Sequence, residues 1–153
     1  EPNKEMLKIG REKLKDHGNI KWFLSPAEKI PFADNSFDFY TISYGIRNVT
    51  DINLCLQEAN RVLKVGGRFM CLEFSKIENE LLNSAYKEYS KLIPIIGKYV
   101  VGSSAPYDYL ISSIKKFYNQ KELCNLMSKN GFSNIEFRNL SNGISAIHSG
   151  WKI

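Results

Sequence analysis

Long apolar runs and cysteine are both scarce in this sequence of 153 residues. Its most apolar stretch, residues 92–101, is interrupted by Pro94, Gly97 and Lys98, so it lacks the roughly twenty apolar residues of a transmembrane helix. The three cysteines are widely spaced and odd in number, which fits neither a disulfide framework nor a zinc site. We therefore expect no structural metal and a reducing, cytoplasmic location.

The first residues, Glu1 to Lys4, also lack an initiator methionine and a signal-peptide pattern. We therefore expect Glu1 to be an internal start, with the chain forming the C-terminal part of a longer protein. The length and the hydrophobic content of 43% suit one globular domain that covers residues 1–153.

Acidic residues are fewer than basic ones, 16 against 21, and the formal net charge is +5. The basic residues gather in two places, at Lys4–Lys15 and at Lys115–Lys116. Such a surplus is found in proteins that bind nucleic acid or anionic lipid, but a solvated lysine-rich helix face is the simpler interpretation. A nucleic-acid-binding module stays an alternative. No recognised motif supports it, and we expect no nucleic-acid partner.

Helical and strand patterns alternate along the chain. Residues 61–75 (RVLKVGGRFMCLEFS) combine the end of a helix, a Gly-Gly turn with Gly66 as the helix C-cap, and a buried strand. We expect helices over residues 3–16, 107–117 and 119–131. A further helix should run from Thr50 or Asp51 to the Gly-Gly turn. The residues of this helix that we expect to face the sheet are Leu54, Ala59, Val62 and Leu63. We expect strands over residues 20–24, 37–43, 68–74, 132–140 and 144–151. This order predicts an α/β protein with a doubly wound sheet and an antiparallel C-terminal hairpin.

Residues 79–118 interrupt the alternation with two helical patterns in succession. Helices inserted after a strand can form a lid over a site at the strand ends, although ordinary packing helices would give the same pattern. We expect a helical insertion at about 79–118.

Three stretches together resemble one enzyme family. Residues 27–38 (AEKIPFADNSFD) resemble a signature of S-adenosylmethionine-dependent methyltransferases. Residues 42–51 (ISYGIRNVTD) and 61–75 are similar to the UbiE-type C-methyltransferases of ubiquinone and menaquinone biosynthesis, and the similarity continues through residues 146–152. The resemblance implies a Rossmann-like methyltransferase fold. It implies C-methylation of a prenylated benzoquinol or naphthoquinol with S-adenosylmethionine as methyl donor and no metal.

The resemblance also implies cofactor-binding residues. Glu1 matches an acidic residue that can accept hydrogen bonds from the ribose hydroxyls. Pro26 and Ala27 match the adenine-contacting position, where the family usually has Asn or Asp in place of Pro26, so only the backbone of Ala27 can bond to the base. Ser43, at a strand end, matches a cofactor-contacting serine, and a structural role is its alternative.

Arg47, Asn48 and Glu73 are the catalytic residues that the resemblance implies. Arg47 can stabilise an oxyanion on the quinol ring, or hold a water that takes the ring proton, and Asn48 can fix a ring hydroxyl. Glu73 can help as a proton acceptor. Structural pairing is the alternative for Arg47, and His148 is expected to be structural.

The family's first strand and the glycine-rich loop after it have no counterpart in the printed sequence. We therefore expect this chain by itself to be inactive and to bind the cofactor weakly, and we expect unpaired sheet edges that favour homo-oligomers. A non-catalytic scaffold in a quinone-synthesis complex is the alternative function. The apolar side chains of 81–101 would suit a prenyl tail, and we expect peripheral contact with the inner membrane.

Overall fold

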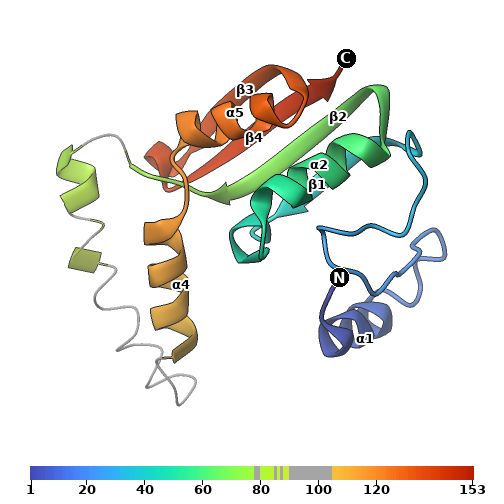
Figure 1. Ribbon diagram of the computed structural model, residues 1–153. Coiled ribbons are helices and arrows are strands. Elements are labelled where there is room, and N and C mark those ends of the chain that lie inside the picture. The colour runs from blue at the N-terminus through green and yellow to red at the C-terminus, as the bar shows by residue number, and fades with distance from the viewer. Residues whose placement is uncertain (78–79, 85, 87, 90–104) are drawn as a thin grey trace.

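The computed structural model describes residues 1–77, 80–84, 86, 88–89 and 105–153. These residues form one four-stranded sheet in the order β1-β2-β4-β3 (Figure 1). The strands are β1 (Phe37–Ser43), β2 (Leu63–Phe74), β3 (Phe132–Leu140) and β4 (Ser145–Lys152). β1 and β2 are parallel, whereas β4 is antiparallel to both β2 and β3. The expected α/β sheet with an antiparallel hairpin is confirmed.

β2 begins earlier than the sequence predicted. The preceding helix α2 (Ile52–Val62) ends at Leu63, so the expected C-cap at Gly66 is wrong. Gly66 does have the positive φ of +81°, but within β2, where the ladder to β1 shifts register. A Cβ on Gly67 would lie 2.7 Å from the carbonyl oxygen of Lys64, so the backbone passes too close for a side chain.

The strand expected over residues 20–24 is wrong. Its backbone groups find partners outside the sheet: the carbonyl of Trp22 accepts from Arg11, and that of Phe23 accepts from the Glu1 amino group. Apolar residues alone predicted this strand, but a strand also needs a neighbour for its hydrogen bonds. β1 is therefore an edge strand among the described residues.

The helices begin where capping residues predict. Asn3 caps α1 (Lys4–Lys13), Asp51 caps α2, and Asn119 with Glu122 forms the capping box of α5 (Gln120–Lys129). α4 spans Ala105–Lys116, as expected. The expected first helix of the insertion lies partly outside the described residues.

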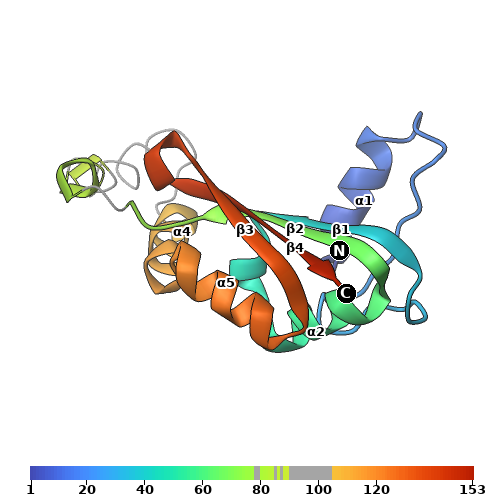
Figure 2. The same cartoon turned by 90° about the horizontal axis from the view of Figure 1, so that it is seen from above.

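α2 and α5 cover one face of the sheet, and the core lies between them and β2 (Figure 2). Phe69 and Cys71 of β2 pack there with Leu56 of α2 and Met127 of α5, all fully buried. The expectation that Leu54 and Leu63 belong to the buried helix face is wrong, because Leu54 is exposed and Leu63 is the first residue of β2. β1 and β2 thus end side by side, next to the turn at residue 44.

Candidate active site

The turn after β1 holds the candidate catalytic residues. Tyr44 has a φ of +50°, a conformation that is strained for an aromatic residue and is often found at functional sites. Its N–H donates to the carbonyl of Leu72 in β2, and its ring lies 4.8 Å from that of Phe74. The chain then enters a short 3-10 helix, η1 (Ile46–Asn48), anchored by the fully buried Ile46. These contacts place Arg47 and Asn48 at the C-terminal ends of two parallel strands.

Arg47 and Glu73 form a buried ion pair. The Arg47 Nη1 and Glu73 Oε1 atoms are 2.6 Å apart, and the two side chains are 9% and 1% exposed. The same carboxylate accepts from the backbone N–H of Phe74 at 2.8 Å, and Arg47 also donates to the Tyr44 carbonyl. The guanidinium lies 5.1 Å from the centre of the Phe74 ring. Arg47 Nε is buried and has no partner among the described residues, so this buried donor is left for a ligand or water.

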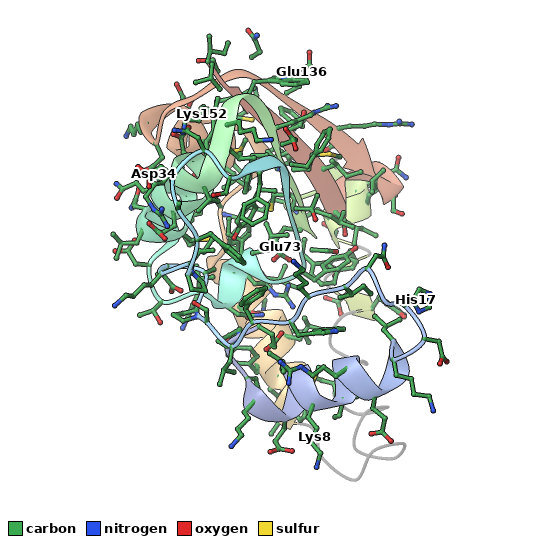
Figure 3. All side chains as sticks on the ribbon, turned by 90° about the vertical axis from the view of Figure 1, so that its right-hand side faces the viewer. Lys8, His17, Asp34, Glu73, Glu136 and Lys152 are labelled. Atoms are coloured by element: carbon green, nitrogen blue, oxygen red, sulfur yellow. The ribbon has the colours of Figure 1, made fainter. Side chains whose placement is uncertain are left out.

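Asn48 is exposed beside this pair and is held from α4. The Tyr109 hydroxyl donates to Asn48 Oδ1 at 3.0 Å. Because the amide oxygen accepts this bond, the two Nδ2 donors of the exposed Asn48 are available to an acceptor. Figure 3 shows Glu73 near the middle of the molecule, with Lys8 and His17 at its outer boundary on the side of α1.

A hollow of about 930 Å³ brings together the four predicted cofactor residues and Asn48. Glu1, Pro26 and Ala27 line it from the N-terminal segment, and Ser43 lines it from the end of β1. Its size is within the range of ligand sites. The cofactor-binding residues predicted from the sequence therefore line one hollow, although they are far apart along the chain.

Two glutamates fasten the loop that carries Pro26 and Ala27. Glu28 Oε1 accepts the N–H of Thr50 at 2.7 Å, beside the start of α2. Glu58 of α2 accepts the N–H of Ile30 and pairs with Arg61, which also donates to the carbonyls of Ile30 and Phe32. These bonds hold the loop against α2.

The hollow offers polar groups that suit an adenosine ligand. Among the described residues, the Ser43 hydroxyl and the backbone of Ala27 make no side-chain or turn hydrogen bond. The Glu1 carboxylate accepts only from the N–H of Asn3, at 3.0 Å. A carboxylate, a hydroxyl and an exposed peptide group can bind ribose hydroxyls and a purine edge, so these residues fit the adenosine half of S-adenosylmethionine.

Comparison with known proteins identifies the family. The profile of the ubiE/COQ5 methyltransferase family matches residues 1–152. The chain belongs to this family. Over 99% of its length it is 50% identical to "2-methoxy-6-polyprenyl-1,4-benzoquinol methylase, mitochondrial" of Bos taurus, and 48% identical to the ubiquinone/menaquinone biosynthesis C-methyltransferase UbiE of Brucella canis. It spans 47% and 58% of the length of these two relatives.

Solved structures agree on the fold. A methyltransferase of Thermotoga maritima that depends on S-adenosylmethionine superposes with a TM-score of 0.71 and 23% identity, over the whole of this chain and 71% of the other. One from Aquifex aeolicus gives 0.67 and 16%, over the whole of this chain and 66% of the other. At these identities the likeness shows the methyltransferase fold alone.

Burial shifts the pKa values of three titratable side chains in this family member. Burial raises the pKa of Tyr40, which lines the hollow, and raises the pKa of Cys55 to about 11. Burial lowers the pKa of His148, whose Nε2 lies 3.0 Å from the carbonyl oxygen of Gln120. All three side chains stay neutral near pH 7. In the described part of the chain no group of three His, Cys, Asp or Glu could hold a metal ion, and no helix has the length and hydropathy to cross a membrane.

Sequence reasoning missed Tyr44, Tyr109 and Glu28. Tyr44 belongs to the family motif, but tyrosine is not a residue type that favours a positive φ. The turn imposes this conformation, so the sequence did not indicate it. Tyr109 is 61 residues from Asn48, and only the placement of α4 brings them together. Glu28 lies next to Ala27, in a loop that has no periodicity to interpret.

Proposed function

We propose that this chain forms the quinol-facing part of a C-methyltransferase that acts on a prenylated benzoquinol or naphthoquinol. The observation that carries the proposal is the buried Arg47, which keeps an unpaired Nε donor beside Asn48 at the ends of β1 and β2. The names of the bovine and Brucella relatives cover both kinds of ring. The two rings present the same pair of quinol oxygens, so one arrangement of donors serves both.

The hollow is the proposed site of S-adenosylmethionine. Glu1 would hold the ribose, Ala27 the adenine through its backbone, and Ser43 the part nearest the strand end. When bound, this cofactor supplies an electrophilic methyl group on a sulfonium sulfur.

The side chains of the turn prepare the quinol ring. A ring carbon attacks a methyl group more readily when the neighbouring oxygen carries negative charge, and Arg47 Nε can donate to that oxygen in a site with little water. Asn48 Nδ2 can donate to the same ring and fix its orientation. The ring proton that is lost on methylation would pass to a water held by Arg47.

Glu73 acts through Arg47 in this proposal. Its carboxylate already accepts two short hydrogen bonds, from Arg47 Nη1 and from the N–H of Phe74, and it is almost fully buried. A carboxylate so engaged holds the guanidinium in one orientation.

A chimaera tests the proposed function. This chain would replace the matching residues of the Brucella canis relative, and the purified chimaera would be given S-adenosylmethionine and 2-methoxy-6-geranyl-1,4-benzoquinol. We expect a ring-methylated product by mass spectrometry. Arg47→Lys, which keeps the charge but loses the planar donors, should reduce kcat about a hundredfold. A soluble, folded chimaera without activity, alongside an active parent relative, would instead favour the scaffold alternative.

Weak cofactor binding by the 153-residue chain itself stays a prediction. Its described residues include contacts for the adenosine half only, so we expect calorimetric titration to show a Kd well above the micromolar range. A micromolar Kd would contradict this expectation.

Peripheral membrane contact, a cytoplasmic location and homo-oligomers through the β1 edge also stay predictions. Lys4 and Lys8 of α1 are exposed, as a solvated face or contact with an anionic surface would require. Figure 3 shows Lys8 at the outer boundary of the molecule. Co-sedimentation with vesicles that contain anionic lipid, at low and high salt, tests the membrane contact, and analytical ultracentrifugation tests the oligomers.

A further inference from the structure

A second cavity, of about 270 Å³, lies beyond the end of β2. None of its described lining residues lines the hollow at Ser43. Ser75 and Ile77 border it from the chain that leaves β2, Tyr86 from the following segment, and Ile111 and Ile114 from α4. It is therefore a separate compartment between the strand end and the helices of the insertion.

Apolar surface predominates in the described walls of this cavity. Three isoleucines and Tyr86 supply it, the half-buried Asn83 adds an amide, and the ammonium groups of Lys76 and Lys115 belong to exposed residues. Ser75 Oγ is buried and has no hydrogen-bond partner among the described residues. Buried hydroxyls without partners are rare in native proteins, so this one points to a ligand or water that occupies the cavity.

The cavity is built on the same elements that hold the proposed catalytic residues. Ser75 lies two positions after Glu73, and Ile111 lies two positions after Tyr109, which is bonded to Asn48. α4 therefore contributes to both places. A substrate whose ring meets Arg47 and Asn48 can extend a substituent into the second cavity.

The size of the cavity suits a short apolar group. A cavity of about 150 Å³ lined by apolar side chains takes up one benzene molecule. This cavity, at about 270 Å³, is nearly twice that volume, so a group of about two isoprene units would fill it.

We propose that this cavity binds the first isoprene units of the prenyl tail, and that Ser75 Oγ donates to the ring oxygen next to the tail. The inference rests on the proposed function for the identity of the ligand. In a 2-methoxy-6-polyprenyl-1,4-benzoquinol the hydroxyl at C1 is the neighbour of the tail at C6. The unpaired Ser75 hydroxyl, at the border of a mainly apolar cavity, matches that pair of substituents.

Direct binding to the 153-residue chain tests the proposal without cofactor or catalysis. The probe is 2-methoxy-6-geranylphenol, which keeps the C1 hydroxyl, the methoxy group and two isoprene units, and its control is 2-methoxyphenol. We expect calorimetry to show binding at least about tenfold tighter for the geranyl compound, because the tail buries apolar surface.

Three variants locate the binding. Ile114→Phe fills the cavity and should weaken geranyl binding about tenfold or more, whereas Ser112→Phe adds the same ring at an exposed position of α4 and should change it less than about twofold. Ser75→Ala, which leaves the volume nearly unchanged, should weaken binding about fivefold while leaving the Tm unchanged or higher, because an unpaired buried hydroxyl is removed.

The outcomes separate the two proposals. Equal binding of both phenols, or geranyl binding that neither Ile114→Phe nor Ser75→Ala reduces, would overturn the assignment of this cavity while leaving quinol methylation to the chimaera assay. If Ile114→Phe fails to fold, Ser75→Ala decides alone. Tail-dependent binding that these variants weaken supports the cavity even if the chimaera proves inactive.

Discussion

Replacing Glu73 by glutamine tests whether the Arg47–Glu73 pair organises the turn after β1. Gln has nearly the same volume and keeps an acceptor for the N–H of Phe74, but it removes the negative charge. The guanidinium of Arg47, 9% exposed, is then left without its counter-ion. Removing one partner of a buried pair costs about 3–5 kcal/mol, and we expect the lower end because the acceptor remains.

The expected loss is large enough to measure by thermal unfolding. For a domain of this size, 1 kcal/mol corresponds to about 2–4 °C in Tm, so Glu73→Gln should lower Tm by about 6–12 °C. Salt should hardly change this difference, because a pair so buried is little screened.

The chain contains a matched control at its surface. Lys64 Nζ and Asp38 Oδ1 are 2.9 Å apart, but the two side chains are 48% and 70% exposed. Asp38→Asn should therefore cost less than about 1 kcal/mol, and that loss should shrink further in high salt.

A double-mutant cycle isolates the coupling between the two side chains. Arg47→Met alone leaves a buried carboxylate, and the variant Arg47→Met/Glu73→Gln leaves neither charge. The double variant should be about 2 kcal/mol more stable than the sum of the two single losses predicts. If the losses simply add, or if Glu73→Gln costs no more than Asp38→Asn, then the pair does not organise the turn after β1.

Three further predictions address other parts of the molecule. In the chimaera, Tyr109→Phe should lower kcat about tenfold with little change in Tm, because it removes only the bond to Asn48 at an exposed position; an unchanged kcat would contradict this. Gly67→Ala should destabilise the chain by more than about 2 kcal/mol in urea unfolding, whereas Gly18→Ala, with open space around it, should be nearly neutral. Burial lowers the pKa of His148, so the unfolded state binds more protons than the folded state as pH falls through the ordinary value of 6.5. Tm should therefore fall over that range, and the fall should be smaller in His148→Gln.

Local interactions explain what the sequence predicted correctly. The strand over residues 37–43 combines aromatic and β-branched residues, and the structure has β1 with these same bounds. The Asn119–Glu122 capping box starts α5 through bonds between residues three apart. Strand propensity and helix capping depend on residues only a few positions apart, so they can be interpreted without knowing the fold.

The errors share the opposite cause. Residues 20–24 have the composition of a strand, but their backbone bonds to Glu1 and Arg11. Leu54 lies eight positions before Val62, which is a helical spacing, yet it is on the exposed side of α2. Gly66 has the expected positive φ, but it adjusts the register of β2 and does not end a helix. In each case a neighbour that is distant in the chain decided the outcome.

The sequence by itself determined the α/β class, the order of most helices and strands, the family and the candidates Arg47, Asn48 and Ser43. These depend on short patterns and on a motif that is contiguous in the chain. Only the tertiary structure paired Arg47 with Glu73, joined Asn48 to Tyr109, and placed Ser75 beside an apolar cavity. Hydrogen bonds and burial act through space, so a charge or hydroxyl acquires its role only when packing removes water from it.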